Sequence, residues 1–219
     1  MPQMNIIQTL VICAIPVLFA VTVHEVAHGW MASKLGDKTA LMLGRLTLNP
    51  IKHIDLFGTI VVPLMLLYFS GGTLLFGWAR PVPVNYGNLK KPRRDMALIA
   101  LAGPLSNFFM AVIWAAIAKL GVIFVGHGML AIRPVVYMGL IGIQLNIIFM
   151  VLNLIPIPPL DGSRIVSSLL PPRWAFRYNQ ITPFGFFILL ALLVTNVLSI
   201  VIGPAFYVFY TIILKIFGL

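Results

Sequence analysis

The sequence predicts an all-α protein that crosses a membrane several times. Of its 219 residues, 60% are hydrophobic and 9% are charged, and the mean hydropathy of +1.03 is far above that of a soluble domain. Uncharged apolar stretches approach or exceed the ~20 residues that a helix needs to cross hydrocarbon. They cover about residues 5–23, 56–78, 96–118, 134–155 and 184–214. We therefore expect five to six membrane segments within a single domain, residues 1–219.

The first apolar stretch predicts a retained helix over about residues 5–33. It lacks the positive start and the small-residue cleavage site of a signal peptide, and it continues directly into His24 and Glu25. The single cysteine, Cys13, lies within this stretch. An intrachain disulfide and a cysteine-rich metal site are therefore excluded.

The basic residues indicate a lipid bilayer as a partner and no nucleic acid. The 15 Lys and Arg against 5 Asp and Glu give a net charge of +10, but they flank the apolar stretches, where such residues contact anionic lipid and set orientation. No basic residue precedes the first helix. The residues that follow it include Lys34, Lys38, Arg45 and Lys52. We expect this helix to run from outside to cytosol, with its polar end toward the cytosolic side.

The five acidic residues are informative because each charge near the centre of a bilayer costs roughly 2.5–3.5 kcal/mol. Asp37, Asp55 and Asp95 each lie beside basic residues and are interpreted as interfacial or loop residues. This interpretation leaves Glu25 and Asp161 as the candidates for chemistry.

Glu25 lies in the motif His24-Glu25-Val-Ala-His28. On a helix, His24 and His28 are one turn apart on one face, so both imidazoles can bind one Zn²⁺ while Glu25 reaches the metal-bound water. A chance match is the alternative for so short a pattern. The chain has only four histidines, however, and unpaired polar groups are costly at the end of an apolar helix.

A catalytic zinc needs a third protein ligand, for which Asp161 is the candidate. It follows a proline-rich segment, residues 156–159, that must break the preceding helix. Taken alone, Asp161 is equally typical of a turn before Gly162 or of a partner for Arg164. His53 is the competing ligand, but its charged neighbours favour an interfacial position.

Together these residues resemble the site-2 proteases, zinc metalloproteases that cut within membrane-spanning substrates. The first motif, residues 24–28, is accompanied by Asn153 and by Leu160-Asp161-Gly162. Further segments resemble the compact bacterial and archaeal branch of that family, which implies a prokaryotic cell membrane. They are residues 44–50, 53–55, 76–84 and 102–107.

The resemblance implies a role for each residue. His24, His28 and Asp161 would bind one zinc ion, Glu25 would be the general base, and Asn153 would contact the substrate backbone. It also implies that the substrate is a transmembrane protein, and that Asn107 is a core residue. No stretch between the expected helices is long enough for the PDZ or CBS module of many relatives.

Three further segments have patterns that allow more than one structure. Residues 56–78 have basic flanks at both ends, so a single crossing would place Asp161 at the opposite face; we expect this segment to enter the membrane and return. Residues 41–48 partly alternate, which predicts either an edge strand for the substrate or a plain interfacial loop. The C-terminal stretch, about residues 184–217, is interrupted at Gly203-Pro204 and predicts one long helix or two short ones.

Other classes of protein share some of these features. A zinc transporter also carries intramembrane His and Asp residues, but it does not need Glu25 between two histidines. A catalytically silent membrane scaffold would have no use for Glu25 and Asp161. Other zincin proteases usually take Glu as the third ligand, and Glu25 is the only glutamate. The sequence leaves the oligomeric state and the identity of the substrate open.

Overall fold

A computed structural model describes residues 6–71 and 77–219 of the chain. Throughout these residues the regular elements are helices, and none of the described segments forms a strand. Five of the helices are long and apolar enough to cross a membrane. The all-α prediction is confirmed, and the protein is a multi-pass membrane protein. The five stretches are Val11–Leu35, Pro92–Gly126, Leu130–Asn153, Pro172–Val194 and Val197–Phe217.

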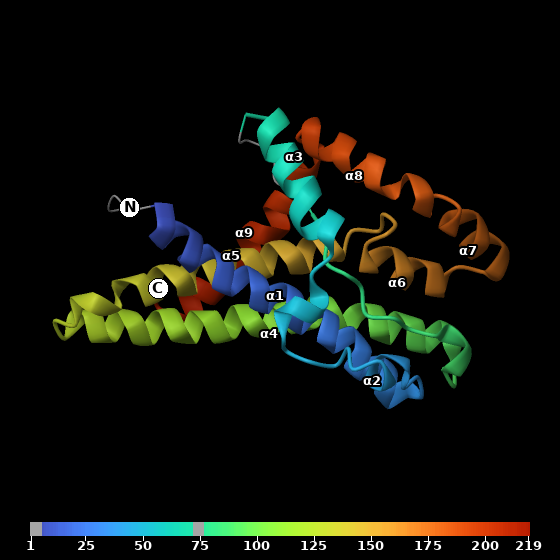
Figure 1. The fold of residues 1–219 in the computed structure, drawn as a ribbon, viewed down its shortest axis with the longest axis horizontal. Coiled ribbons are helices and arrows are strands. Elements are labelled where there is room, and N and C mark those ends of the chain that lie inside the picture. The colour runs from blue at the N-terminus through green and yellow to red at the C-terminus, as the bar shows by residue number, and fades with distance from the viewer. Residues whose placement is uncertain (1–5, 72–76) are drawn as a thin grey trace.

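Three long helices form the centre of the molecule: α1 (Ile6–Leu35), α4 (Pro92–Gly126) and α5 (Arg133–Asn153). They run roughly side by side in Figure 1. Small residues allow the close approach of α4 and α5: a Cβ on Gly142 would lie 2.3 Å from the Trp114 ring. Such contacts drive helix association in lipid, where burial of apolar surface gives little. The buried core here includes Ala111, Trp114, Ala115, Ile143 and Ile147.

The connection after α5 brings Asp161 back to the bundle. The helix ends at Asn153, ahead of the three prolines, and α6 (Asp161–Leu169) begins after an irregular segment. A Cβ on Gly162 would lie 2.2 Å from the carbonyl oxygen of Leu154. Only glycine therefore lets the first turn of α6 pack this closely beneath the end of α5.

Residues 56–71 and 77–80 leave the bundle and return to the same place. One π-helical turn, η2 (Leu56–Val61), continues into α3 (Val62–Phe69). The backbone N–H of Trp78 then donates to the carbonyl of Gly58 at 3.0 Å. This return is the geometry that a re-entrant segment requires, and α3 projects from the bundle in Figure 1. The tip of the expected segment, residues 72–76, lies outside the described residues.

The edge strand expected over residues 41–48 does not form. Helix α2 (Thr39–Met42) takes the first two of these residues. Gly44 follows at φ +63°, in the left-handed region, which interrupts an extended backbone. The alternative prediction of a loop describes the remaining residues.

The C-terminal stretch forms separate helices, but the break lies elsewhere than expected. Helix α8 (Gly185–Val194) is followed by α9 (Val197–Phe217), and Asn196 between them has φ +60°. Asn tolerates this left-handed conformation better than most residues. Pro204 lies inside α9, so the predicted interruption at Gly203-Pro204 is wrong; membrane helices tolerate an internal proline.

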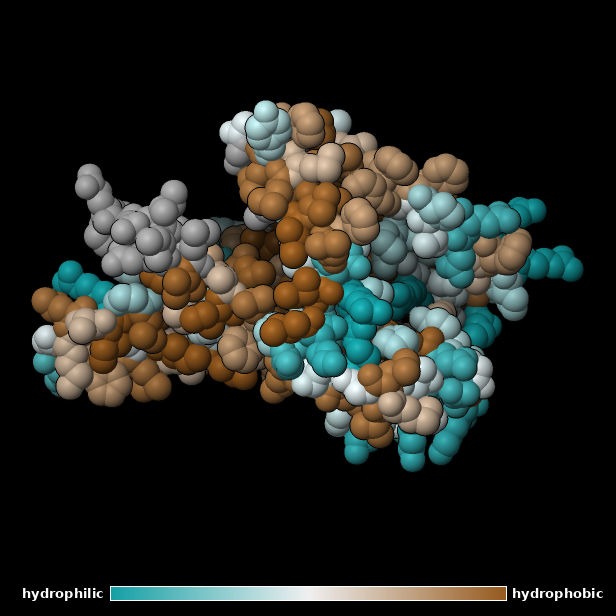
Figure 2. Space-filling model, viewed as in Figure 1, coloured by the Kyte–Doolittle hydropathy of each residue, from teal (hydrophilic) through white to brown (hydrophobic). Residues whose placement is uncertain are grey.

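A short amphipathic helix, α7 (Pro172–Asn179), precedes α8. Figure 2 shows hydrophilic residues gathered mostly at the end of the molecule that holds α2 and α7, whereas apolar residues cover most of the remaining visible surface. Short 3₁₀ turns complete the fold: η1 (Pro50–His53), η3 (Tyr86–Asn88), η4 (Leu130–Ile132) and η5 (Thr182–Phe184).

Candidate metal centre

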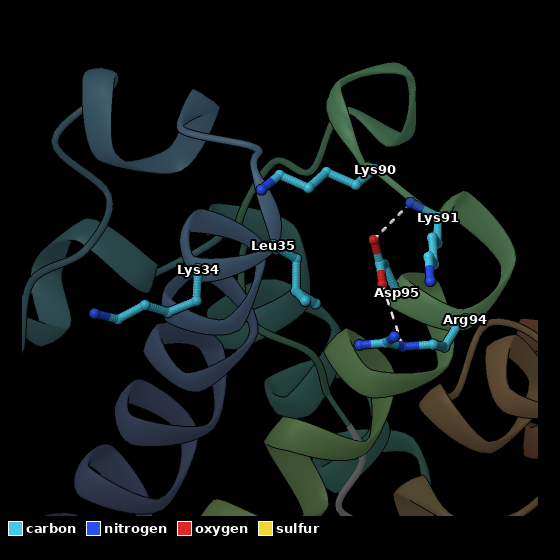
Figure 3. A pocket seen from close by; sticks show the side chains of 6 residues that line it. All are labelled: Lys34, Leu35, Lys90, Lys91, Arg94 and Asp95. Atoms are coloured by element: carbon cyan, nitrogen blue, oxygen red, sulfur yellow. Dashed lines mark hydrogen bonds and ion pairs between the residues drawn. The ribbon is translucent and has the colours of Figure 1, made fainter.

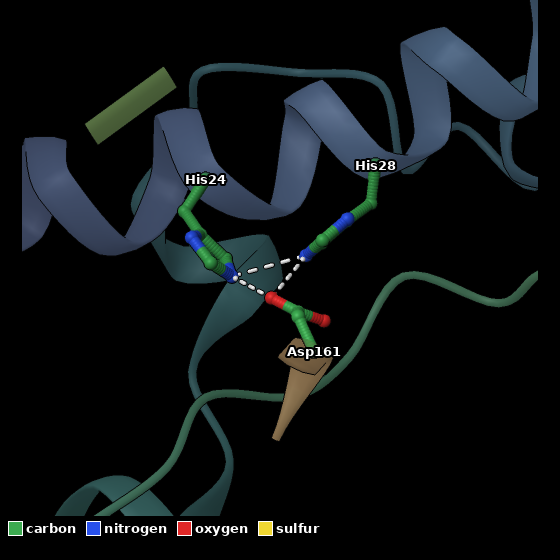
Figure 4. Close-up of side chains that lie close together, drawn as sticks. All are labelled: His24, His28 and Asp161. Carbon is green, nitrogen blue, oxygen red and sulfur yellow. Dashed lines mark hydrogen bonds and ion pairs between the residues drawn. The ribbon is translucent and has the colours of Figure 1, made fainter. Parts of the chain in front are cut away.

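His24, His28 and Asp161 meet in the interior of the bundle. The Nε2 atoms of the two histidines are 3.0 Å apart, and Asp161 Oδ2 lies 3.1 Å from each of them. Figure 4 shows both rings pointing from α1 toward the carboxylate at the start of α6. The three residues are only 9%, 5% and 6% exposed. In the described part of the chain, they form the one group of three or more His, Cys, Asp or Glu residues whose ligand atoms lie close enough to hold a metal ion.

The His28 ring is oriented by the backbone of α4. Its Nδ1 lies 2.7 Å from the carbonyl oxygen of Ile99. A carbonyl only accepts hydrogen bonds, so Nδ1 carries the proton and donates it. The lone pair of His28 Nε2 is thereby left facing the centre of the group.

A chain of amides orients the His24 ring in the same way. Asn146 Nδ2 donates to the carbonyl of Gly142 at 2.8 Å, which turns Asn146 Oδ1 toward Asn107. Asn107 Nδ2 then donates to Asn146 Oδ1 at 3.0 Å and to the carbonyl of Ala20 at 3.1 Å. Asn107 Oδ1 is left to accept from His24 Nδ1 at 2.7 Å. Two backbone carbonyls therefore fix both amides and leave His24 Nε2 with a lone pair.

The resulting donor set fits a zinc ion. Two imidazole lone pairs and one carboxylate oxygen, all acceptors, lie within 3.1 Å of one another. Such groups repel each other unless a cation lies among them. Ligands about 2.0–2.2 Å from a tetrahedral zinc are separated by roughly 3.3 Å, so outward shifts of a few tenths of an ångström suffice. Two His and one carboxylate also leave the fourth position for water.

Known proteins resemble this chain along most of its length. Peptidase family M50 matches residues 12–128 and 119–195. The chain belongs to peptidase family M50. It is 43% identical over 209 residues to "Putative zinc metalloprotease YwhC" of Bacillus subtilis, covering 93% of this chain and 90% of the relative. The enzyme class is therefore that of a zinc metalloprotease.

More distant relatives carry the same description. "Putative zinc metalloprotease Rip2" of Mycolicibacterium smegmatis is 26% identical over 193 residues, and that of Mycobacterium tuberculosis strain H37Rv is 29% identical over 188 residues. Each comparison covers 83% of this chain and 66% of the relative. No solved structure matches the chain.

A glycine lets α4 of this M50 protein approach the two histidines. A Cβ on Gly103 would lie 2.4 Å from His28 Nε2 and 2.6 Å from His24 Cε1. Any side chain there would overlap the imidazoles that α4 also orients through Ile99 and Asn107. The sequence does not reveal the contact of Gly103 with the histidines, since that contact depends on how the helices pack.

Glu25 faces a different neighbour from the two histidines. Its Oε2 accepts a hydrogen bond from the backbone N–H of Val82 at 2.8 Å. Val82 belongs to the non-helical segment that precedes α4. Arg45 holds that segment by donating to the carbonyl of Arg80 at 3.0 Å. One carboxylate oxygen of Glu25 is therefore fixed, and the other is not engaged by this contact.

Other predicted site residues lie outside the group of three. Asn153, at the end of α5, is half-buried and donates through Nδ2 to the carbonyl of Phe149 at 2.9 Å. His53 is 2% exposed, with Nε2 2.9 Å from the carbonyl of Thr47. Its backbone-bonded ring fills the interior of the loop and is not part of the metal-binding group.

Two acidic residues outside the group of three are buried within the protein. Asp37 lies in a loop, as expected, and Asp95 lies in the first turn of α4; they are 0% and 2% exposed. Backbone donors explain this: the N–H of Asn85 bonds Asp37 and the N–H of Lys91 bonds Asp95. Asp161 lies close both to the histidines and to Arg164: Oδ2 faces the histidines, and Oδ1 is 4.0 Å from Arg164 Nη1. It therefore meets the expectations of a third ligand and of a partner for Arg164.

The amides that orient His24 were not recognised from the sequence as functional. Asn107 was expected to be a core residue, and Asn146 received no role. Both are 0% exposed within apolar helices. An amide within an apolar membrane segment requires a hydrogen-bond partner, so both residues could have been noticed. The sequence does not identify that partner.

Proposed function

We propose that this protein hydrolyses a peptide bond within or near a transmembrane segment of a membrane protein. The observation that supports the proposal is the buried group of His24, His28 and Asp161, with Glu25 on the same helix, in a protein built from membrane-length helices. One zinc ion bound by the three residues would lower the pKa of a bound water and polarise the scissile carbonyl.

The residues of the chain would divide the remaining work. Glu25 would take the proton from the attacking water. The N–H of Val82 holds one oxygen of Glu25 in place, which favours the other oxygen as the proton acceptor. Asn107 and the carbonyl of Ile99 hold the two rings in the required tautomer. Asn153 would contact the substrate backbone once its amide releases the carbonyl of Phe149.

We place the site inside the bilayer, toward the cytosolic face of a prokaryotic cell membrane. Lys34 follows His24 by ten residues, or roughly 15 Å along α1 at ~1.5 Å per residue, and basic residues mark the cytosolic end of a membrane helix. If the segment that begins at Leu56 enters the membrane and returns, α4 and α5 bring Asp161 back to the same depth. A cysteine-accessibility map that put residues 52 and 90 on opposite faces would contradict this topology.

The proposal is tested by co-expressing candidate single-pass substrates with wild type and with Glu25→Gln. The variant keeps an acceptor for the N–H of Val82, so the fold should persist, and zinc content measured on the purified proteins should be equal. We expect cleavage product with wild type and none with the variant. Equal product from both would reject Glu25 as the base and the proposed enzyme mechanism with it.

A further inference from the structure

A hollow of about 180 Å³ lies between the end of α1 and the start of α4. Figure 3 shows it from close by, with α1 on one side and the first turn of α4 on the other. It lies apart from the metal centre, at the end of α1 beyond His28. The lining residues are Lys34, Leu35, Lys90, Lys91, Arg94 and Asp95.

The positive charge around the hollow exceeds what its acidic residue can neutralise. Four of the six lining residues are cations and one is an acid. The Asp95 side chain is 3% exposed; its Oδ2 accepts from the N–H of Lys91 at 2.8 Å, and its Oδ1 is 3.7 Å from Arg94 Nε. Lys34 directs its Nζ over the Trp30 ring, 5.7 Å from the centroid, so only its stem lines the hollow. Lys90 and Lys91 have no acidic partner in the described part of the chain.

The start of α4 adds to this positive potential. The helix is 35 residues long, and its N-cap residue, Lys91, makes no side-chain cap to the first turn. A helix N-terminus carries a partial positive charge and exposes backbone donors to an anion. Arg94 offers a planar set of donors that suits phosphate oxygens, and lysines supply point charges. The combination suits an anion such as phosphate.

We propose that this hollow binds the phosphate of an anionic lipid headgroup. Trp30, 52% exposed, lies one turn before Lys34 with the lysine over its ring, an arrangement typical of the membrane interface. Leu35 gives the hollow an apolar wall where the lipid glycerol and chains would begin. The bound headgroup would join the end of the helix that carries His24 and His28 to the start of the helix that orients them. Lipid binding at this position would therefore stabilise the spacing of α1 and α4 around the metal centre.

The test measures lipid binding to the full-length protein in neutral detergent, by native mass spectrometry with phosphatidylglycerol and with phosphatidylcholine. The double variant K90Q/R94Q removes two cations from the hollow. The control K38Q/K52Q removes two exposed cations that do not line it. At ~1 kcal/mol for each basic residue near an anionic surface, K90Q/R94Q should bind phosphatidylglycerol about 30-fold more weakly. K38Q/K52Q should bind it like wild type.

Two results would overturn the proposal. Equal losses in the two double variants would mean that lipid binding responds only to the total charge of the protein. Equal binding of both lipids by wild type would mean that the hollow does not select a headgroup with a net negative charge. Inorganic phosphate, added at the same concentration as the lipid, should leave the lipid bound. Complete displacement would assign the hollow to free phosphate and reject the lipid. Equal zinc content in all variants would show that the folds are comparable.

Discussion

The central helices and the C-terminal helices of this protein are held in different ways. In the hydrophobic windows of the first three membrane-length stretches, 33%, 28% and 39% of residues are buried inside the protein, against 11% in each of the last two. Around the metal centre, directed hydrogen bonds link α1, α4 and α5 through Asn107, Asn146 and Ile99. Much of the contact between the flanking helices and their neighbours comes instead from apolar and aromatic side chains, such as Phe209 of α9 against Phe108 of α4.

This difference indicates which side chains must be held in fixed positions. A metal site tolerates little movement of its ligands, so its supporting shell must specify both distance and proton position. Helices that face lipid need no such directional contacts. We therefore expect substitutions near the metal to act through geometry, and substitutions on the flanking helices to be nearly silent. The predictions below test that contrast in order of decreasing effect.

Gly103→Ala should have the largest effect. Its methyl group would lie 2.4 Å from His28 Nε2, so α4 or the imidazole must move, and a misplacement of about 1 Å costs roughly 100-fold in activity. Cleavage of a co-expressed substrate and bound zinc should both fall. Gly126→Ala, on the same helix with nothing within 4 Å of its added methyl, is the control and should match wild type. Similar losses in both variants would point to a general effect on α4.

Asn107→Leu should reduce zinc affinity by about 10- to 100-fold, the usual effect of removing a group that orients a ligand. Leucine has a similar branched outline and a somewhat larger volume, but it no longer accepts from His24 Nδ1. Competition with a zinc chelator would measure the change. Gln144→Leu removes an exposed amide from α5 and should leave the affinity unchanged. Wild-type zinc affinity in Asn107→Leu would show that the hydrogen bond from His24 to Asn107 does not support metal binding.

Asp37→Asn should lower the free energy of unfolding at neutral pH by about 1–3 kcal/mol, the cost of leaving buried donors unpaired. Burial alone would raise the pKa of the Asp37 carboxyl, but hydrogen bonds from Thr39, Asn88 and Asn85 hold it below the ordinary value of 3.8. The carboxylate therefore contributes stability above that value, and the contribution is lost as pH falls through the lower pKa of the folded state. Thermal unfolding between pH 3 and pH 7 should show wild type and variant converging at the acidic end. A difference that is constant with pH would contradict this.

Ile200→Ala on α9 should change the unfolding free energy by less than about 0.5 kcal/mol. Ile200 is 69% exposed, whereas Ile147 on α5 is 0% exposed. Ile147→Ala leaves a cavity in the packed centre and should cost about 2–5 kcal/mol. Unfolding by denaturant in a fixed detergent would compare the two. Equal changes in the unfolding free energy would contradict the difference between the central helices and the C-terminal helices.

The parts of this structure that follow from local sequence were predictable. The spacing of His24 and His28 fixes their common face on any helix, and the prolines after Asn153 end α5 in any context. The scarcity of acidic residues then isolated Asp161 as the candidate third ligand, and the structure places it beside both histidines.

The parts that depend on packing were not predictable in the same way. The contact of Gly103 with the histidines exists only because α4 crosses α1 at that level. The partner of Asn146 is Asn107, 39 residues away on another helix. The break between α8 and α9 depends on the left-handed backbone of Asn196, which the neighbouring residues do not predict. Gly203-Pro204 is typical of a helix end, but it lies inside α9.

The most direct test of the central claim is X-ray absorption at the zinc edge, combined with the zinc content of the purified protein. We predict about one zinc per chain, with two imidazole nitrogens and one carboxylate oxygen at ~2.0–2.2 Å. Asp161→Asn should lose most of the metal, whereas Asp55→Asn should keep it. A zinc-free wild type, or equal zinc in the two variants, would contradict the assignment of Asp161 as the third ligand.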